Sequence, residues 1–270
     1  MKRLIILQAG KGGSGKSTAA RAFIDLARRS GRTVAAYDLD GGTGSLAMLY
    51  KDRDPQVGAA TENARDPDAP AAWLNDVHGD ADDVCLDVPG GALGDLVRVL
   101  AGGAQTLINE AKEAGREIVL VSVIGIKRDA TLAPIEAIRM FGVEVKHIAI
   151  KNGFFAPADG FVVFDGLTVD GVQKYGKAKI AVEEAGGTVI YMPKLDHITD
   201  AVLDIEGYTF AAGGRSGQVI GRRAATNARY WLDLVEEAFR GTWLDVSGVV
   251  PGTDQQPNGK ARARSVAENV

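Results

Sequence analysis

The residues with the clearest chemistry stand near the start of the chain, in a glycine-rich segment that ends in lysine, serine and threonine. Residues 10–18 read Gly-Lys-Gly-Gly-Ser-Gly-Lys-Ser-Thr, directly after an apolar run at 4–7 and before a helical pattern over 17–29. Glycines at these spacings let backbone N–H groups converge on phosphate oxygens, while Lys16 reaches the outer phosphates and Ser17 binds Mg²⁺. The N-terminus of the following helix favours the same anion. The alternative to phosphate binding is that this segment is only a glycine-rich turn whose lysine is solvated.

The whole segment is therefore expected to bind a nucleoside triphosphate, which we take to be ATP with Mg²⁺. The expected nucleotide contacts are Gly10, Lys11, Gly12, Gly13, Ser14, Gly15, Lys16, Ser17 and Thr18.

Lys11 occupies a loop position at which the general pattern accepts any residue. Lys-Gly-Gly-x-Gly-Lys-Ser resembles the deviant phosphate-binding loop of the ParA/MinD family of dimerising ATPases. In that family the extra lysine reaches across a dimer interface to the partner's nucleotide. The resemblance implies a homodimer when ATP is bound, with Lys11 and Lys16 both serving catalysis.

Two carboxylates end the second apolar run, which reads Tyr-Asp-Leu-Asp-Gly-Gly over 37–42. They project from alternate positions near the expected γ-phosphate, where one plausible role is to position water. The resemblance places this segment as the first switch, with Asp40 orienting the attacking water and Asp38 facing the metal. The alternative is that both carboxylates cap the next helix through Thr43 and Ser45. Partition proteins usually have Pro-Gln where this chain has Gly41-Gly42.

The third apolar run closes in Leu-Asp-Val-Pro-Gly-Gly over 86–91. Asp87 can hold Mg²⁺ through water and the Gly90 N–H can meet the γ-phosphate, so this turn is the predicted second switch. Taken alone, Asp-x-Pro-Gly is a common turn, and Val88 stands where the family usually has Thr.

Two later segments resemble the part of the family that surrounds the base. Asn152 follows the run 148–150, and Pro193 follows the run 188–191. The resemblance implies that Asn152 recognises adenine and that Pro193 lies beside it. An ordinary Asn-Gly turn is the alternative for Asn152.

The apolar runs alternate with helical patterns, which predicts an α/β fold: a doubly wound, mostly parallel sheet flanked by helices, of the P-loop NTPase type. Ligands should then lie at the carboxyl edge of the sheet. The expected strands cover 4–7, 34–37, 84–88, 118–124, 145–150 and 188–191, and the expected helices 17–29, 93–114, 132–141 and 171–185. We expect a single domain over 1–244, with a loop-rich excursion at 52–80 carrying a short helix near Trp73. Residues 245–270 read as a disordered tail.

Composition limits the partners. The lone Cys85 excludes nitrogenase-type iron proteins and arsenical pumps, which need more cysteines. No segment approaches the roughly 18 apolar residues of a membrane span, and no signal-peptide pattern is evident, so we expect a cytoplasmic protein without membrane attachment. Net charge is −4, so nonspecific DNA binding would need a local basic patch. The candidates for that patch are Arg215, Arg222, Arg223, Arg229 and Arg240.

These features favour an ATP-dependent dimerising switch with slow hydrolysis, accelerated by an activating partner protein. Its leading role is plasmid or chromosome partition or the positioning of a cargo, and the conjugal-transfer and plasmid-stability ATPases (TraL and StbB type) are the near alternative. A second class is a P-loop kinase or ligase for a small metabolite. Its acceptor site would use Lys127, Arg128 and Asp129, or the excursion.

Overall fold

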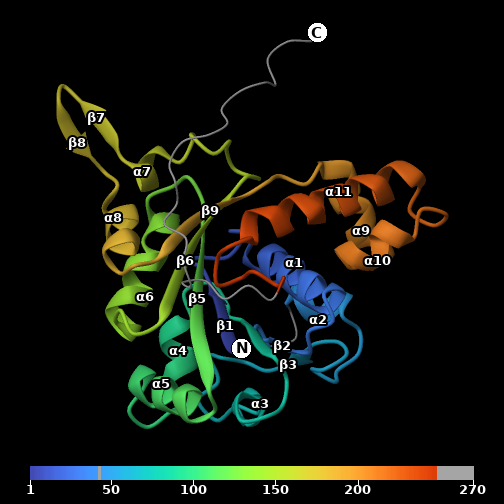
Figure 1. Ribbon diagram of the computed structural model, residues 1–270, viewed down its shortest axis with the longest axis horizontal. Helices are drawn as coiled ribbons and strands as arrows, with labels where there is room; N and C mark the ends of the chain where they lie inside the picture. The colour runs from blue at the N-terminus through green and yellow to red at the C-terminus, as the bar shows by residue number, and fades with distance from the viewer. Residues whose placement is uncertain (42–43, 248–270) are drawn as a thin grey trace.

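One parallel sheet organises the computed structural model, which describes residues 1–41 and 44–247 (Figure 1). In that part of the chain the sheet has seven strands in the order β3-β2-β4-β1-β5-β6-β9, and every neighbouring pair is parallel. The strands are β1 (Lys2–Gln8), β2 (Val34–Asp38), β3 (Ala60–Thr61), β4 (Asp83–Asp87), β5 (Arg116–Ile124), β6 (Lys146–Asn152) and β9 (Thr188–Met192). The predicted doubly wound α/β fold is confirmed.

Alternating side chains along each strand feed two separate cores. In β1, Ile5 and Leu7 pack on one face of the sheet, whereas Leu4 and Ile6 pack on the other. Helices cover both faces, as the two sides of the sheet in Figure 1 show. The first face carries α1 (Lys16–Arg29), α2 (Ser45–Leu49), α9 (His197–Glu206), α10 (Phe210–Arg215) and α11 (Arg222–Phe239). The second carries α3 (Trp73–Val77), α4 (Leu93–Arg98), α5 (Ala104–Glu113), α6 (Ala133–Phe141), α7 (Val162–Asp165) and α8 (Lys177–Glu184).

Two expected helices differ in the structure. The helix expected over 93–114 is broken between α4 and α5, where Gly102 and Gly103 have φ of 90° and 64°. The helix expected from 171 begins only at Lys177, because residues before it form the antiparallel hairpin β7 (Leu167–Val169) and β8 (Val172–Lys174). Asp170 and Gly171 at its tip have φ of 52° and 74°, as a two-residue hairpin turn requires.

The excursion at 52–80 contains the edge strand β3 and the expected short helix, α3, which begins at Trp73. At the other end of the chain, the packed structure continues past the boundary expected at 244, because Val246 is buried. The rest of the expected tail, 248–270, lies outside the described residues.

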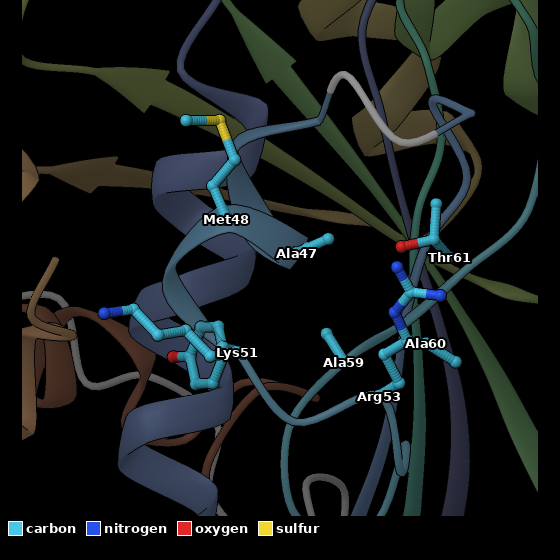
Figure 2. A pocket seen from close by; sticks show the side chains of 8 residues that line it. Ala47, Met48, Lys51, Arg53, Ala59, Ala60 and Thr61 are labelled. Carbon is cyan, nitrogen blue, oxygen red and sulfur yellow. The ribbon is translucent and has the colours of Figure 1, made fainter.

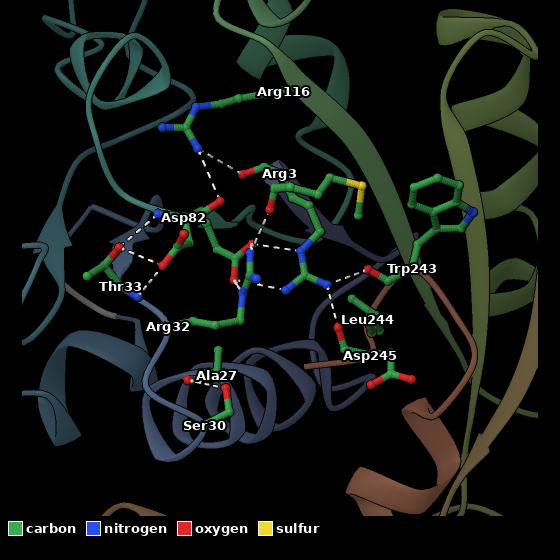
Figure 3. Close-up of polar contacts among 12 residues, drawn as sticks. Arg3, Ala27, Ser30, Arg32, Thr33, Asp82, Arg116, Trp243, Leu244 and Asp245 are labelled. Carbon is green, nitrogen blue, oxygen red and sulfur yellow. Dashed lines mark hydrogen bonds and ion pairs between the residues drawn. The ribbon is translucent and has the colours of Figure 1, made fainter. Parts of the chain in front are cut away.

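A buried ion cluster joins the start of β1 to this C-terminal segment (Figure 3). Arg3 donates to both carboxylate oxygens of Asp83 at 2.7 and 2.9 Å, and Arg32 donates to the same oxygens at 2.7 and 2.9 Å. The Arg3 guanidinium also donates to the carbonyls of Trp243 and Asp245, each at 2.9 Å. Arg3 and Asp83 are both buried, so each charge depends on the other for its solvation.

We therefore expect Asp83→Ala to lower the free energy of unfolding by about 3–5 kcal/mol, because it leaves Arg3 buried without its carboxylate. Urea unfolding followed by circular dichroism measures this. Asp80→Ala is the matched control: Asp80 is fully exposed and lies 3.5 Å from Lys2, and its loss should leave the midpoint unchanged. Equal midpoints for the two variants would contradict the assignment.

Candidate functional site

The predicted site residues meet at the carboxyl edge of the sheet. The glycine-rich loop leaves β1 and enters α1, while Asp38 and Asp87 end the adjacent strands β2 and β4 and lie in register with each other. Asn152 ends β6 and pairs in register with Met192 at the end of β9. This edge is where open parallel sheets bind ligands.

Close backbone packing fixes the glycine-rich loop. Gly13 and Gly15 have φ of 76° and 84°, which other residues rarely adopt. The Asn152 side chain donates to the Ser14 carbonyl at 2.8 Å and lies where a Cβ on Gly15 would stand. A β-carbon on Gly90 would likewise meet the backbone of Lys11 and Gly12. The loop is thus shaped by neighbours from β6 and from the predicted second switch.

Lys16 forms an ion pair with Asp87 in a nearly closed environment. The Lys16 side chain is 11% exposed and that of Asp87 is 1% exposed. Burial raises the pKa of the Asp87 carboxyl above its ordinary value, and the opposing effects of Lys16 and of a hydrogen bond from Ser17 offset only part of this rise. The lysine, the hydroxyl and the carboxylate that the sequence singles out therefore touch one another.

The oxygen donors near Lys16 are few, which suits Mg²⁺ better than a metal ion that the protein must enclose with its own side chains. No group of three or more His, Cys, Asp or Glu side chains with metal-binding geometry occurs in the part of the chain that the structure describes. Mg²⁺ takes one or two protein oxygens and completes its shell with water and phosphates. The Ser17 hydroxyl and Asp87 carboxylate fit that requirement.

Asp38 contacts the start of α2, but through a residue other than Thr43 or Ser45, which the alternative interpretation named. Its buried carboxylate accepts hydrogen bonds from the backbone N–H of Ala47, in the first turn of α2, at 2.9 Å and from that of Asp40 at 3.2 Å. Thr43, one expected capping contact, lies outside the described residues. The metal role of Asp38 stays a prediction.

Asp40 lies on the open side of the same segment. Its side chain is 44% exposed and lies 3.7 Å from the Arg65 guanidinium. Arg65 also donates to the Gly90 carbonyl at 3.0 Å. Nothing in the sequence singles out this arginine beyond its place in the excursion, and it contacts both predicted switches.

Lys11 points to solvent from the loop, where it pairs with Asp129 at 2.5 Å. Half of the Lys11 side chain is exposed, and the hydrogen bond from Lys11 lowers the pKa of the Asp129 carboxyl. A pocket of about 180 Å³ opens beside this pair. Its lining includes Gly125, Lys127 and Phe155.

Asn152 and Pro193 line a second pocket, of about 250 Å³, together with Gly13, Gly15 and Thr18 of the loop and helix. Trp231 from α11 forms another wall and donates its indole N–H to the Pro193 carbonyl at 2.8 Å. This tryptophan had no signal in the sequence, because it comes from a helix distant along the chain.

Two of the five C-terminal arginines line the same pocket. Arg215 and Arg229 line a pocket of about 200 Å³ with Arg29, which is itself paired with Asp233 and Glu236 at 2.8 and 2.7 Å. Arg240 pairs instead with Glu237.

A wider hollow, of about 660 Å³, lies between α2 and β3 (Figure 2). Met48 and Lys51 line it on the helix side and Arg53 and Thr61 line it on the opposite side, and none of the predicted site residues is among its lining. Among the described residues, none of the helices combines the length and apolar character that crossing a bilayer requires.

Comparison with solved structures finds distantly similar chains. The septum site-determining protein MinD of Pyrococcus horikoshii, solved with Mg-ADP, is 15% identical, with 88% of this chain and 97% of that chain covered and a TM-score of 0.49. A ParA family ATPase from Chlorobium tepidum is 13% identical, with 86% and 98% covered and a TM-score of 0.46. No curated protein matches the sequence.

The family itself is established by the sequence. Residues 5–253 match the family described as the CobQ/CobB/MinD/ParA nucleotide binding domain. This match spans the loop, both predicted switches and the base-side segments, and it confirms the resemblance to ParA and MinD. The chain belongs to the CobQ/CobB/MinD/ParA nucleotide-binding domain family.

Proposed function

We propose that this chain is an ATP-dependent switch that dimerises around ATP and Mg²⁺ and hydrolyses ATP slowly. The observation that carries the proposal is the different environment of the two lysines of one loop, Lys11 and Lys16. Lys16 is enclosed beside Ser17 and Asp87, whereas Lys11 is half exposed and paired with Asp129. An enclosed lysine serves the nucleotide of its own subunit, and an exposed one is available to a second subunit.

Phosphate binding requires an exchange of partners at Lys16. The triphosphate offers Lys16 several anionic oxygens, which frees the Asp87 carboxylate to hold Mg²⁺ with Ser17. Bound Mg²⁺ would neutralise charge that develops on the phosphates. Gly90 belongs to the second switch and packs against the loop backbone, so a contact between its N–H and the γ-phosphate would make the conformation of this switch depend on that phosphate.

Asp40 is the residue we assign to the attacking water. Its carboxylate follows the strand that places Asp38 beside Asp87, and it remains partly exposed, so water can reach it. The base would occupy the pocket bounded by Asn152, Pro193 and Trp231, which opens onto the phosphate loop.

The biological role proposed for the switch is partition of DNA or positioning of a cargo, with a partner protein that accelerates hydrolysis. Arg215 and Arg229 line one hollow and supply positive charge suited to phosphate groups of nonspecific DNA, whereas Arg29 beside them is paired with Asp233 and Glu236. The alternative is a conjugal-transfer or plasmid-stability ATPase, which would bind a protein partner and ignore DNA.

A small-metabolite kinase or ligase is the second candidate, and the pocket beside Lys11 favours it. That pocket of about 180 Å³ adjoins the phosphate loop and includes Lys127, so it has room for a small acceptor. A kinase of this kind has no need of ATP-dependent dimerisation, which separates the two candidates.

Lys16→Ala should weaken ATP binding by about 100-fold or more, because it removes the charged donor to the phosphates. Titration with a fluorescent ATP analogue measures the affinity. Lys177→Ala is a matched control, since Lys177 also begins a helix after a left-handed glycine, Gly176, and should bind ATP normally. Micromolar affinity in folded Lys16→Ala would remove the phosphate-loop assignment.

Lys11→Ala should bind ATP but fail to dimerise, because the bridging charge is lost. Light scattering with ATP and Mg²⁺ measures the mass. In Asp129→Ala the lysine remains and only its partner within the subunit is removed, so this variant should still dimerise. A wild-type mass that does not change with ATP would favour the kinase.

Asp40→Ala should bind ATP and form a long-lived dimer without turnover, since binding does not need the water-positioning carboxylate. Sedimentation of this variant with nonspecific double-stranded DNA at low and moderate salt measures assembly and DNA binding together. Salt-sensitive co-sedimentation supports partition, and a dimer that ignores DNA supports the conjugal alternative. Hydrolysis at the wild-type rate would exclude Asp40 from the mechanism.

A further inference from the structure

The Arg65 side chain contacts both predicted switches. One guanidinium nitrogen donates to the Gly90 carbonyl at 3.0 Å, and the other lies 3.7 Å from the Asp40 carboxylate. Gly90 in turn packs on the Lys11–Gly12 peptide of the phosphate loop. The planar guanidinium of Arg65 thus links the two predicted switches, and through Gly90 it is connected to the phosphate loop. A γ-phosphate would fit between the loop and these two segments.

The backbone around Arg65 runs along the first switch and is hydrogen-bonded to it. Glu62 N–H donates to the Asp38 carbonyl at 2.9 Å, Gly41 N–H to the Glu62 carbonyl at 2.9 Å, and Ala64 N–H to the Leu39 carbonyl at 3.0 Å. Asn63 pairs with Asp40 as an isolated antiparallel bridge. Residues 62–64 are therefore held against residues 38–41.

The turn that follows aims Arg65 across to the second switch. The Asn63 side-chain oxygen accepts the Arg65 backbone N–H at 3.0 Å, and the Asn63 carbonyl accepts that of Asp66 at 3.1 Å. Because this turn is fixed by its own hydrogen bonds, the direction of Arg65 does not depend on the weak ion pair with Asp40.

Two physical effects of this position bear on hydrolysis. Asp40 must hold its carboxylate near an anionic phosphate, and a neighbouring guanidinium offsets their repulsion. The forked geometry of arginine also allows contact with a carboxylate and a carbonyl at once, which a lysine point charge reproduces poorly.

We propose that Arg65 is a positioning residue for ATP hydrolysis, which sets the Asp40 carboxylate against the second switch at Gly90. This inference rests on the proposed ATPase function and adds a residue to it. Arg65 acts through Asp40 and Gly90, so ATP binding itself does not require it.

The test compares Arg65→Ala and Arg65→Lys with wild type in steady-state hydrolysis. We expect kcat to fall about 10- to 100-fold in Arg65→Ala, as a misplaced catalytic group does, while KM and ATP affinity change less than about two-fold. Arg65→Lys should recover part of kcat. The ATP-bound dimer of Arg65→Ala should dissociate more slowly than that of wild type.

Arg53→Ala is the matched control, because Arg53 is an exposed arginine of the same excursion that lines the hollow between α2 and β3. Amide hydrogen exchange without nucleotide adds a readout independent of turnover: residues 38–41 and 90–91 should exchange faster in Arg65→Ala and at the wild-type rate in Arg53→Ala. Wild-type kcat or unaltered exchange in Arg65→Ala would overturn the proposal. If the wild-type protein neither binds nor hydrolyses ATP, the ATPase function is overturned instead. Amide hydrogen exchange would then still test whether Arg65 holds the two switch segments together.

Discussion

The buried ion pair between Lys16 and Asp87 is the interaction on which the rest of the site depends. Each group is out of water, so either one alone would be costly, and burial raises the pKa of the Asp87 carboxyl. The pair holds the lysine in a desolvated position before any ligand arrives. In the proposed nucleotide complex a phosphate would replace the Asp87 carboxylate beside Lys16, and the free-energy cost of removing water from Lys16 is already part of the fold.

This constraint explains why the loop is packed so closely by its neighbours. Lys16 begins α1, so its position against Asp87 is set by the path of the backbone through Gly13 and Gly15. Asn152 holds the backbone in that path, because its amide donates a hydrogen bond to the Ser14 carbonyl and fills the space beside Gly15. Asn152 therefore supports the loop whether or not it also contacts the base.

The sequence predicts the fold, the loop and the meeting of Asp38 and Asp87, because these follow from strand order and from residues adjacent along the chain. It does not predict the Lys11–Asp129 and Arg65–Gly90 contacts or the Trp231 wall, since each joins elements that are distant in sequence. The hairpin at 167–174 had a local signal in Asp170-Gly171, which the helical pattern over 171–185 concealed. The roles of the site residues stay predictions.

The excursion at 52–80 contains little regular structure, yet two sets of hydrogen bonds fix it to the site. At its start, Arg28 near the end of α1 donates to the carbonyls of Pro55, Val57 and Gly58 at 3.1, 2.8 and 2.9 Å. Farther along, residues 62–64 are bonded to residues 38–41. Because α1 begins at the phosphate loop, the excursion is connected to that loop through the helix as well as through the first switch. A segment held in this way can place a side chain as accurately as a strand does, although its sequence reads as a loop.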